Sequence, residues 1–198
     1  MSGLLDFLSR VDRALFDLVN RDWTHPWLDA FFPWLTELDR SRVFLFGAVP
    51  VLLGFWVYRQ KGRAVKIILA TALAVGFCDA VSYRFIKPAV ARSRPSIFFS
   101  TIRTTRHTGW SFPSNHSANT FAGATVLAMA VPGAGVPAFG VAALVAYSRV
   151  YCGVHYPFDV LAGALLGLLG GGLVGAGLQH FMGGRGSSAP PRKKRSRS

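Results

Sequence analysis

The chain has 198 residues, 51% of them hydrophobic, and carries a formal net charge of +13 at pH 7. Several long apolar runs approach the roughly 20 residues that cross a bilayer, which favours a bundle of membrane helices over one soluble domain. The charge does not indicate nucleic-acid binding. The basic residues gather at the ends of apolar runs and in the C-terminal tail, where membrane proteins keep positive charge in the cytoplasm.

Carboxylates are scarce in the body of the chain. Seven of the nine acidic residues precede Arg42, and only Asp79 and Asp159 follow it. A Mg²⁺ or Ca²⁺ site that needs several carboxylates therefore has almost nothing to draw on there. Cys78 and Cys152 have no zinc-like spacing and imply no disulfide framework. We expect no metal site and no cofactor.

The N-terminal segment, residues 1–41, differs from the rest of the chain. Residues 3–20 place leucine and valine at helical spacing among charged residues, which predicts an amphipathic helix lying on the membrane. This helix is too charged to span, and it lacks the basic start and apolar centre of a signal peptide. Residues 26–38 are rich in aromatic side chains and predict an interfacial or shallow segment.

Five stronger apolar runs follow the N-terminal segment. They predict an all-α membrane protein, a bundle of five to six transmembrane helices within residues 42–182, preceded by the amphipathic interfacial helix. The basic, low-complexity tail at 183–198 is expected to be disordered. The runs cover about 42–58, 65–86, 114–131, 136–151 and 158–181.

Alternation of these helices places the loop 87–113 and the connection 152–157 on one face of the membrane. The tail lies on the other face. Because the tail is basic, we expect it in the cytoplasm and the long loop outside, in a bacterial inner membrane. The last run also carries glycines at four-residue steps, a stripe that lets another helix approach closely and that we interpret as packing. These glycines are Gly163, Gly167, Gly171 and Gly175.

Three polar groups fall on the loop face by this alternation: Lys87 to Pro95, Pro113 to His116, and Ser148 to Asp159. Each contributes at least one cation or titratable side chain to that face. The cations offer fixed charge and donors suited to phosphoryl oxygens. They are Lys87, Arg94 and Arg149.

The remaining side chains of these groups complement the cations. His116 and His155 titrate near neutral pH, so one can attack and the other can donate a proton. Asp159 follows His155 by four residues and is placed to orient its imidazole. Ser114 sits where a span begins, so its hydroxyl and the following backbone N–H groups can meet an anion at a helix N-terminus.

The spacings K-x6-R-P, P-S-x-H and S-R-x5-H-x3-D resemble those of the type-2 phosphatidic acid phosphatase superfamily. The resemblance implies a metal-free membrane phosphatase in which His155 attacks phosphorus, Asp159 orients it, and His116 protonates the leaving oxygen. It also implies that a set of five residues holds the phosphoryl oxygens, one of them through its backbone. These are Lys87, Arg94, Ser114, Asn115 (backbone) and Arg149.

Two features depart from the family pattern. Asn115 stands where the family more commonly has glycine, which adds a side chain near the phosphate. The charged N-terminal helix replaces the usual first span, which leaves the number of crossings open. Asp79, about eight residues before Lys87, is interpreted as pairing with a neighbouring helix. Five loop residues either contact a substrate or belong to a solvated loop: Arg92, Arg103, Arg106, His107 and Trp110.

The substrate is expected to be a membrane lipid, and the bilayer is the other partner. Undecaprenyl pyrophosphate is the first choice, with phosphatidylglycerophosphate, lipid A 1-phosphate and transfer of the phosphate to another lipid as alternatives. A membrane transporter or lipid-binding scaffold is the non-enzymatic alternative. It is disfavoured because its polar residues should lie near the bilayer midplane, whereas these motifs crowd one interface. The sequence leaves the oligomeric state open.

Overall fold

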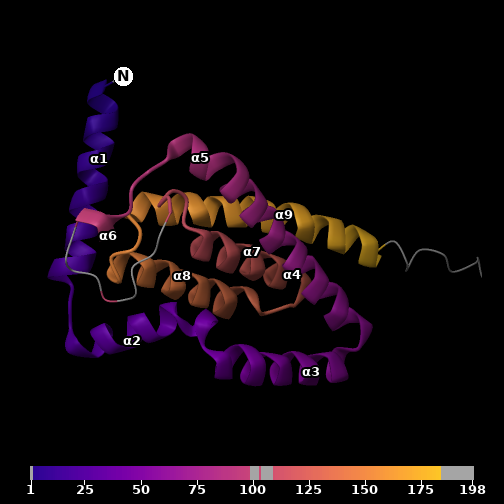
Figure 1. Ribbon diagram of the computed structural model, residues 1–198. Helices are drawn as coiled ribbons and strands as arrows, with labels where there is room; N and C mark the ends of the chain where they lie inside the picture. Colours follow the sequence, from indigo (N-terminus) through magenta and orange to yellow (C-terminus); the bar gives the residue numbers. More distant parts are fainter. Residues whose placement is uncertain (1, 99–102, 104–108, 184–198) are drawn as a thin grey trace, which may run out of the picture.

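The computed structural model describes residues 2–98, 103 and 109–183, and every regular element within those ranges is a helix (Figure 1). Among the described residues, nine α-helices carry the fold, and short 3-10 or π-helical turns extend or connect them at Leu18–Asp22, Leu38–Arg40, Phe44–Ala48 and Ser82–Ile86. The α-helices are α1 Ser2–Asp17, α2 Pro26–Thr36, α3 Val49–Gln60, α4 Gly62–Val81, α5 Lys87–Val90, α6 Pro95–Phe98, α7 Asn115–Ala130, α8 Gly135–Tyr151 and α9 Pro157–Gly183.

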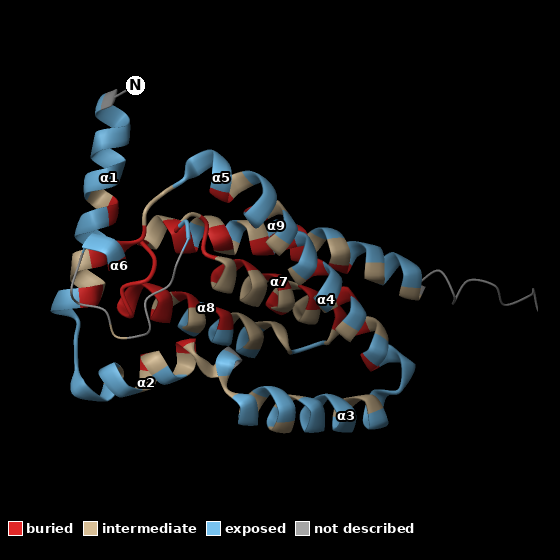
Figure 2. Cartoon of the chain, in the orientation of Figure 1, coloured by how far each residue is buried: buried red, intermediate tan, exposed pale blue. Residues whose placement is uncertain are grey.

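Helix α7 forms the centre of the bundle, with α4, α8 and α9 packed around it (Figures 1 and 2). Its buried face is made of small side chains such as Ala118 and Ala122, which meet Ala74 and Cys78 of α4. In lipid, no hydrophobic effect drives helices together. Membrane helices therefore associate by close packing, which small side chains allow because they let the backbones approach each other. The core is therefore narrow and built on alanine and glycine.

The glycine stripe of α9 is the contact with α7. A Cβ atom added at Gly167 would lie 2.2 Å from the carbonyl oxygen of Ala118, and one at Gly163 would lie 2.3 Å from that of Ser114. Neither backbone position leaves room for a methyl group. The interpretation of the stripe as packing is confirmed, and it holds the start of α9 directly against Ser114.

Two helices within the described ranges are long and apolar enough to cross a membrane, Gly62–Val90 and Pro157–Met182. Helices α7 and α8 have 16 and 17 residues, which corresponds to about 24 and 26 Å. Large apolar side chains such as Leu69 and Leu165 are exposed on the outer face of the bundle, which is typical of helices that face lipid. All five predicted runs are helical, while the count of five to six crossings stays a prediction.

The N-terminal helices lie against the end of the bundle where α9 begins (Figure 1). Phe16 of α1 is fully buried and packs against Tyr156, with ring centroids 5.4 Å apart. Phe32 of α2 packs against Tyr151 in the same way, at 4.9 Å. Helices α1 and α2 thus occupy the two segments expected to be helical or interfacial, and their depth relative to the bilayer stays a prediction.

Candidate active site

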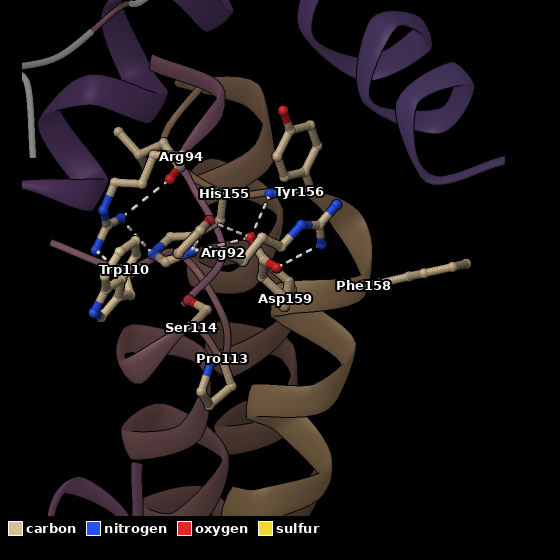
Figure 3. Close-up of polar contacts among 12 residues, drawn as sticks. Arg92, Arg94, Trp110, Pro113, Ser114, His155, Tyr156, Phe158 and Asp159 are labelled. Carbon is tan, nitrogen blue, oxygen red and sulfur yellow. Dashed lines mark hydrogen bonds and ion pairs between the residues drawn. The ribbon is translucent and has the colours of Figure 1, made fainter. Parts of the chain in front are cut away.

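The three predicted motifs meet at one end of the bundle (Figure 3). Arg94 follows α5, Ser114 caps the start of α7, and His155 and Asp159 lie in the loop and first turn that begin α9. The backbone N–H of Ser114 donates to the carbonyl oxygen of Asp159 at 2.9 Å, which ties the second motif to the third. The convergence predicted from helix alternation is therefore observed.

His155 is 2% exposed, and each of its ring nitrogens has a partner. Nε2 lies 3.0 Å from Nη1 of Arg94. Nδ1 lies 3.5 Å from Oδ2 of Asp159 and 3.4 Å from Oγ of Ser111. The Ser111 hydroxyl also donates to the same Oδ2 atom in a short hydrogen bond. The Nε2 side of the imidazole thus meets a cation, and the Nδ1 side meets a carboxylate.

Lys87 and Arg94 are buried cations that donate mainly to backbone carbonyls. Lys87 Nζ donates to the oxygens of Trp110 and Pro113 at 3.0 and 2.9 Å. Arg94 donates to the oxygens of Gly109, Val154 and Trp110 at 3.1 to 3.2 Å. Carbonyl dipoles orient a cation but do not neutralise it, and burial of net charge is costly. The arrangement therefore favours an anion at this end of the bundle.

The side chain of Arg149 is also buried, in the last turn of α8. Its Nη1 donates to Oγ1 of Thr36 at 2.5 Å, which ties it to α2. Its carbonyl oxygen accepts from the backbone N–H groups of Val154 and His155 at 3.1 and 3.2 Å. Arg149 therefore shapes the loop that carries His155.

Burial is the main cause that lowers the pKa of His155, and the charges of Arg94 and Arg149 lower it further. The hydrogen bond with Asp159 acts in the opposite direction. Burial disfavours the charged form of an imidazole because that form loses its hydration. His155 is accordingly held as a neutral imidazole, the form that has a lone pair for nucleophilic attack.

The second motif is divided between the site and the helix core. Ser114 is the N-cap of α7, and its hydroxyl accepts from the backbone N–H of Ser117 at 3.5 Å. The Asn115 side chain donates to Asp79 of α4 at 2.5 Å and accepts from Ser82, in the π-helical turn that follows α4, at 2.8 Å. The amide is therefore used between two helices, while the expectation that this side chain lies near the phosphate stays a prediction. The interpretation of Asp79 as a helix-pairing residue is confirmed.

His116 is half-buried in the first turn of α7, two residues after Ser114. Because α7 begins where the motifs converge, His116 lies close to them. The assignment of the leaving-group proton to His116 stays a prediction.

Sequence and structure comparisons identify the family. The PAP2 superfamily is matched over residues 63–180. The chain belongs to this superfamily. It is 32% identical over 184 residues to a lipid A 4'-phosphatase from Porphyromonas gingivalis, an alignment that covers 86% of this chain and 74% of that protein.

Two further PAP2 relatives are named for activity on other lipids. An undecaprenyl-diphosphatase from Sulfolobus acidocaldarius is 32% identical over 157 residues, with 77% of this chain and 71% of that protein covered. The crystal structure of a transmembrane PAP2-type phosphatidylglycerolphosphate phosphatase from Bacillus subtilis matches with a TM-score of 0.67 at 27% identity, covering 88% of this chain and 87% of that one. The protein is thus a PAP2-type membrane lipid phosphatase.

Three residues of this PAP2 site were not found by sequence reasoning. Ser111 lies two positions before the second motif and carries no spacing signal. Arg92 was considered only as a substrate contact or a solvated residue, yet it bridges two carboxylates, donating to Asp159 at 2.7 Å and to Asp12 at 2.5 Å. Asp12 belongs to α1, where its charge fits an amphipathic surface helix, and only the tertiary structure shows that it is 1% exposed.

The remaining residues predicted to contact a substrate or to belong to a solvated loop differ in their contacts. Arg103 donates to Asp29 at 2.6 Å and to the carbonyl oxygens of Asn20 and Tyr151 at 2.7 and 3.1 Å, so it fastens the N-terminal segment to the bundle. Trp110 supplies the carbonyl oxygen shared by the two buried cations of the first motif. Arg106 and His107 lie outside the described residues.

Proposed function

We propose that this PAP2 protein hydrolyses a phosphate or diphosphate group of a membrane lipid through a phosphohistidine formed on Nε2 of His155. The observation that carries the proposal is the arrangement at that imidazole. Asp159 lies on the Nδ1 side and Arg94 on the Nε2 side. A nucleophile whose second nitrogen is oriented by a carboxylate, with a phosphate-binding cation at the attacking atom, is suited to phosphoryl transfer.

In the first step, the lone pair of Nε2 forms the P–N bond while the bond from phosphorus to the lipid oxygen breaks. His116 donates a proton to that departing oxygen. In the second step, His116 takes a proton from water, the water oxygen attacks phosphorus, and the P–N bond breaks. Inorganic phosphate leaves and His155 returns to its neutral form. Throughout both steps, Nδ1 of His155 keeps its proton and directs it at Asp159, which accepts.

The phosphoryl oxygens would be held by the cations of the site and by the start of α7. Lys87, Arg94 and Arg149 supply positive charge, and Ser114 and the backbone N–H of Asn115 supply donors at a helix N-terminus. Charge develops on these oxygens in the transition state, so donors fixed in advance stabilise it most. In this proposal the positioned cations replace the metal ions that other phosphoryl-transfer enzymes use.

Undecaprenyl pyrophosphate is the first candidate substrate, because a compact protein with a site at the end of its membrane helices suits a lipid whose diphosphate lies at the headgroup level. A lipid A phosphate is the second candidate, since the P. gingivalis relative that covers 86% of this chain is named for that reaction. Both lipids offer a terminal phosphate group and would use the same residues.

Phosphate release by the purified protein tests the proposal directly. The panel contains undecaprenyl pyrophosphate, lipid A and phosphatidylglycerophosphate at equal surface concentration, each assayed with a chelator and with a His155→Ala control. We expect release from at least one lipid in the chelator and none from the control, with acid-labile phosphate trapped on the wild-type protein. Activity that appears only after Mg²⁺ is added, or that survives in His155→Ala, would refute the mechanism.

A further inference from the structure

Asp12 of α1 is a buried carboxylate that reaches the catalytic end of the bundle from outside all three PAP2 motifs. One of its oxygens, Oδ2, accepts from Nη2 of Arg92 at 2.5 Å. The other, Oδ1, accepts from the backbone N–H of Phe158 at 2.8 Å. Phe158 is the second residue of α9 and immediately precedes Asp159. Asp12 therefore satisfies one of the unpaired N–H groups at the start of the helix that carries the orienting carboxylate.

Arg92 connects the two carboxylates. Its Nη1 donates to Oδ1 of Asp159 at 2.7 Å (Figure 3). Its Nη2 donates to Asp12. Its guanidinium also lies over the ring of Tyr156, 4.0 Å from the centroid. The planar fork of arginine can bridge two acceptors in fixed directions, which a lysine ammonium does not do. Contacts on both arms and on the face leave the guanidinium a single orientation.

The two oxygens of Asp159 have separate partners. Oδ2 faces His155, and it also accepts from Ser111 and from the backbone N–H of Tyr156 at 2.9 Å. Oδ1 faces Arg92. Because Arg92 fixes the second oxygen, it sets the plane in which the first oxygen meets the imidazole. A positive charge at this distance also favours the ionised form of the carboxylate, which is the form that accepts from Nδ1.

We infer that Asp12 and Arg92 are positioning residues that act through Asp159 on His155, so that helix α1 is part of the catalytic apparatus. The inference rests on the proposed function, because it assumes that the orientation of His155 limits phosphoryl transfer. Outer partners of a functional histidine fix its tautomer and ring orientation in the same way at metal sites.

Simple docking of α1 does not account for this arrangement. Phe16 already anchors the helix, since it is fully buried against Tyr156. A buried carboxylate adds a desolvation cost that an apolar residue would avoid. Asp17 of the same helix shows the alternative, because it pairs with Arg21 at 3.3 Å with both side chains more than two-fifths exposed. Asp12, unlike Asp17, directs its charge toward the catalytic end.

Steady-state kinetics of matched variants tests the inference. Asp12→Asn keeps an oxygen that can accept from Phe158 but loses the charge, Arg92→Gln removes the bridge, and Asp17→Asn is the control on the same helix. We expect Asp12→Asn and Arg92→Gln to lower kcat by about tenfold to a hundredfold, the range for outer partners of a functional histidine. KM should change little, and Asp17→Asn should match the wild type.

A double variant distinguishes positioning through Arg92 from an unrelated loss of activity. If Asp12 acts through Arg92, Asp12→Asn combined with Arg92→Gln should lose no more activity than Arg92→Gln alone. Additive losses, a change confined to KM, or wild-type activity in Asp12→Asn would overturn the inference. Should Asp12→Asn fail to fold, Arg92→Lys carries the test, since it retains the charge and lacks the fork. Wild-type activity in that variant would overturn the inference equally.

A measurement without substrate keeps the two proposals distinguishable. In protein labelled with ¹⁵N-histidine, the His155 resonances are identified by their loss in His155→Ala. We expect the Nδ1 resonance to shift in Asp12→Asn and Arg92→Gln and to stay in place in Asp17→Asn. An unchanged resonance in the first two variants contradicts the inference. This result does not depend on any lipid being hydrolysed, so it stands apart from the phosphate-release assay.

Discussion

Nη1 of Arg94 lies 3.0 Å from Nε2 of His155, and this contact selects the tautomer of the imidazole. A guanidinium only donates hydrogen bonds, so Nε2 must accept and Nδ1 must carry the proton. The Nδ1 proton is then directed at Asp159 and Ser111. The atom proposed to attack phosphorus is thus covered by the cation proposed to bind the phosphoryl group. A substrate phosphate would have to draw the guanidinium away from the ring.

The first prediction concerns the titration of His155. Burial and the charge of Arg94 lower its pKa below the ordinary value of about 6.5. A lowered pKa means that the neutral form persists as pH falls through 6.5, so kcat/KM should not lose activity there through this residue. Titration of the ¹⁵N-histidine resonances should show His155 still neutral below that pH. Protonation near pH 6.5 in the wild-type protein would contradict the prediction.

The second prediction separates the two histidines. Loss of His155 should abolish both the acid-labile phosphoenzyme and turnover, by roughly a thousandfold or more, because catalytic groups act as a unit. Loss of His116 should matter most when the leaving oxygen needs a proton. A nitrophenyl phosphate, whose leaving group needs little protonation, should therefore partly rescue His116→Ala and leave His155→Ala inactive.

Both variants must keep the wild-type melting transition in detergent for this comparison. Asp159→Asn is a useful third variant, since it keeps the nucleophile and favours the wrong tautomer, and a better leaving group should not repair it. Equal rescue of the two histidine variants, or phosphate trapped on His116, would reverse the assignment of roles.

The third prediction concerns the glycine contact between α7 and α9. In Gly167→Ala the new methyl group would meet the Ala118 carbonyl oxygen at 2.2 Å, and the backbone there cannot move aside as a flexible side chain would. Overpacking of this kind costs about 1–3 kcal/mol. Gly172→Ala is the matched control on the same helix, since nothing lies within 4 Å of its Cβ position. Thermal melting in detergent should show a lower melting temperature for Gly167→Ala and no decrease for Gly172→Ala.

Sequence reasoning predicted the helices and the glycine contact because both follow from local periodicity. The pattern of apolar runs placed α7, α8 and α9 within two residues of their observed ends at every boundary. The motif spacings likewise identified Arg94, His155 and Asp159, which the structure brings together. These features are visible in a single segment of chain or in the order of segments.

The partners of those residues were less accessible to prediction. Asp12 and Phe158 are hydrogen-bonded across 146 positions, and a pairing at that separation depends on how the helices pack. The partners of the Asn115 side chain were missed for a related reason. Its amide is bound by Asp79 of α4 and by Ser82 in the turn that follows α4, and neither contact is signalled by the motif. A motif predicts where the backbone lies, whereas contacts with neighbouring helices determine the rotamer of each side chain.

The fourth prediction concerns the polar contacts between α4 and α7. Asp79 accepts from the amides of Asn115 and Asn119 at 2.5 and 3.2 Å. Asp79→Ala would remove the acceptor of both, and polar contacts between membrane helices contribute about 1 kcal/mol. We expect a lower melting transition in detergent, with turnover per folded molecule much closer to wild type than in Asp159→Asn. A loss of turnover as large as that of Asp159→Asn would instead place Asp79 in catalysis.

The fifth prediction concerns topology. The loop 87–113 should be extracytoplasmic and the tail after Arg185 cytoplasmic, because the tail is basic and three predicted spans, an odd number, separate it from the loop. Single cysteines at positions 104 and 188, both outside the described residues, are introduced without Cys78 and Cys152. An impermeant thiol reagent applied to whole cells should label position 104 and spare 188. The reverse pattern would invert the orientation.

The hydrogen bond between Asp12 and Phe158 joins α1 to the beginning of α9 across 146 positions of the chain. Because α1 precedes α9 in the chain, the ribosome synthesises α1 first. A nascent chain that stops before α9 has the cations of the first motif but lacks the carboxylate that orients the nucleophile. Hydrolytic competence should therefore appear only when α9 has joined the other helices in the bilayer, and a translation-arrested product ending before Pro157 should release no phosphate from the lipid substrate.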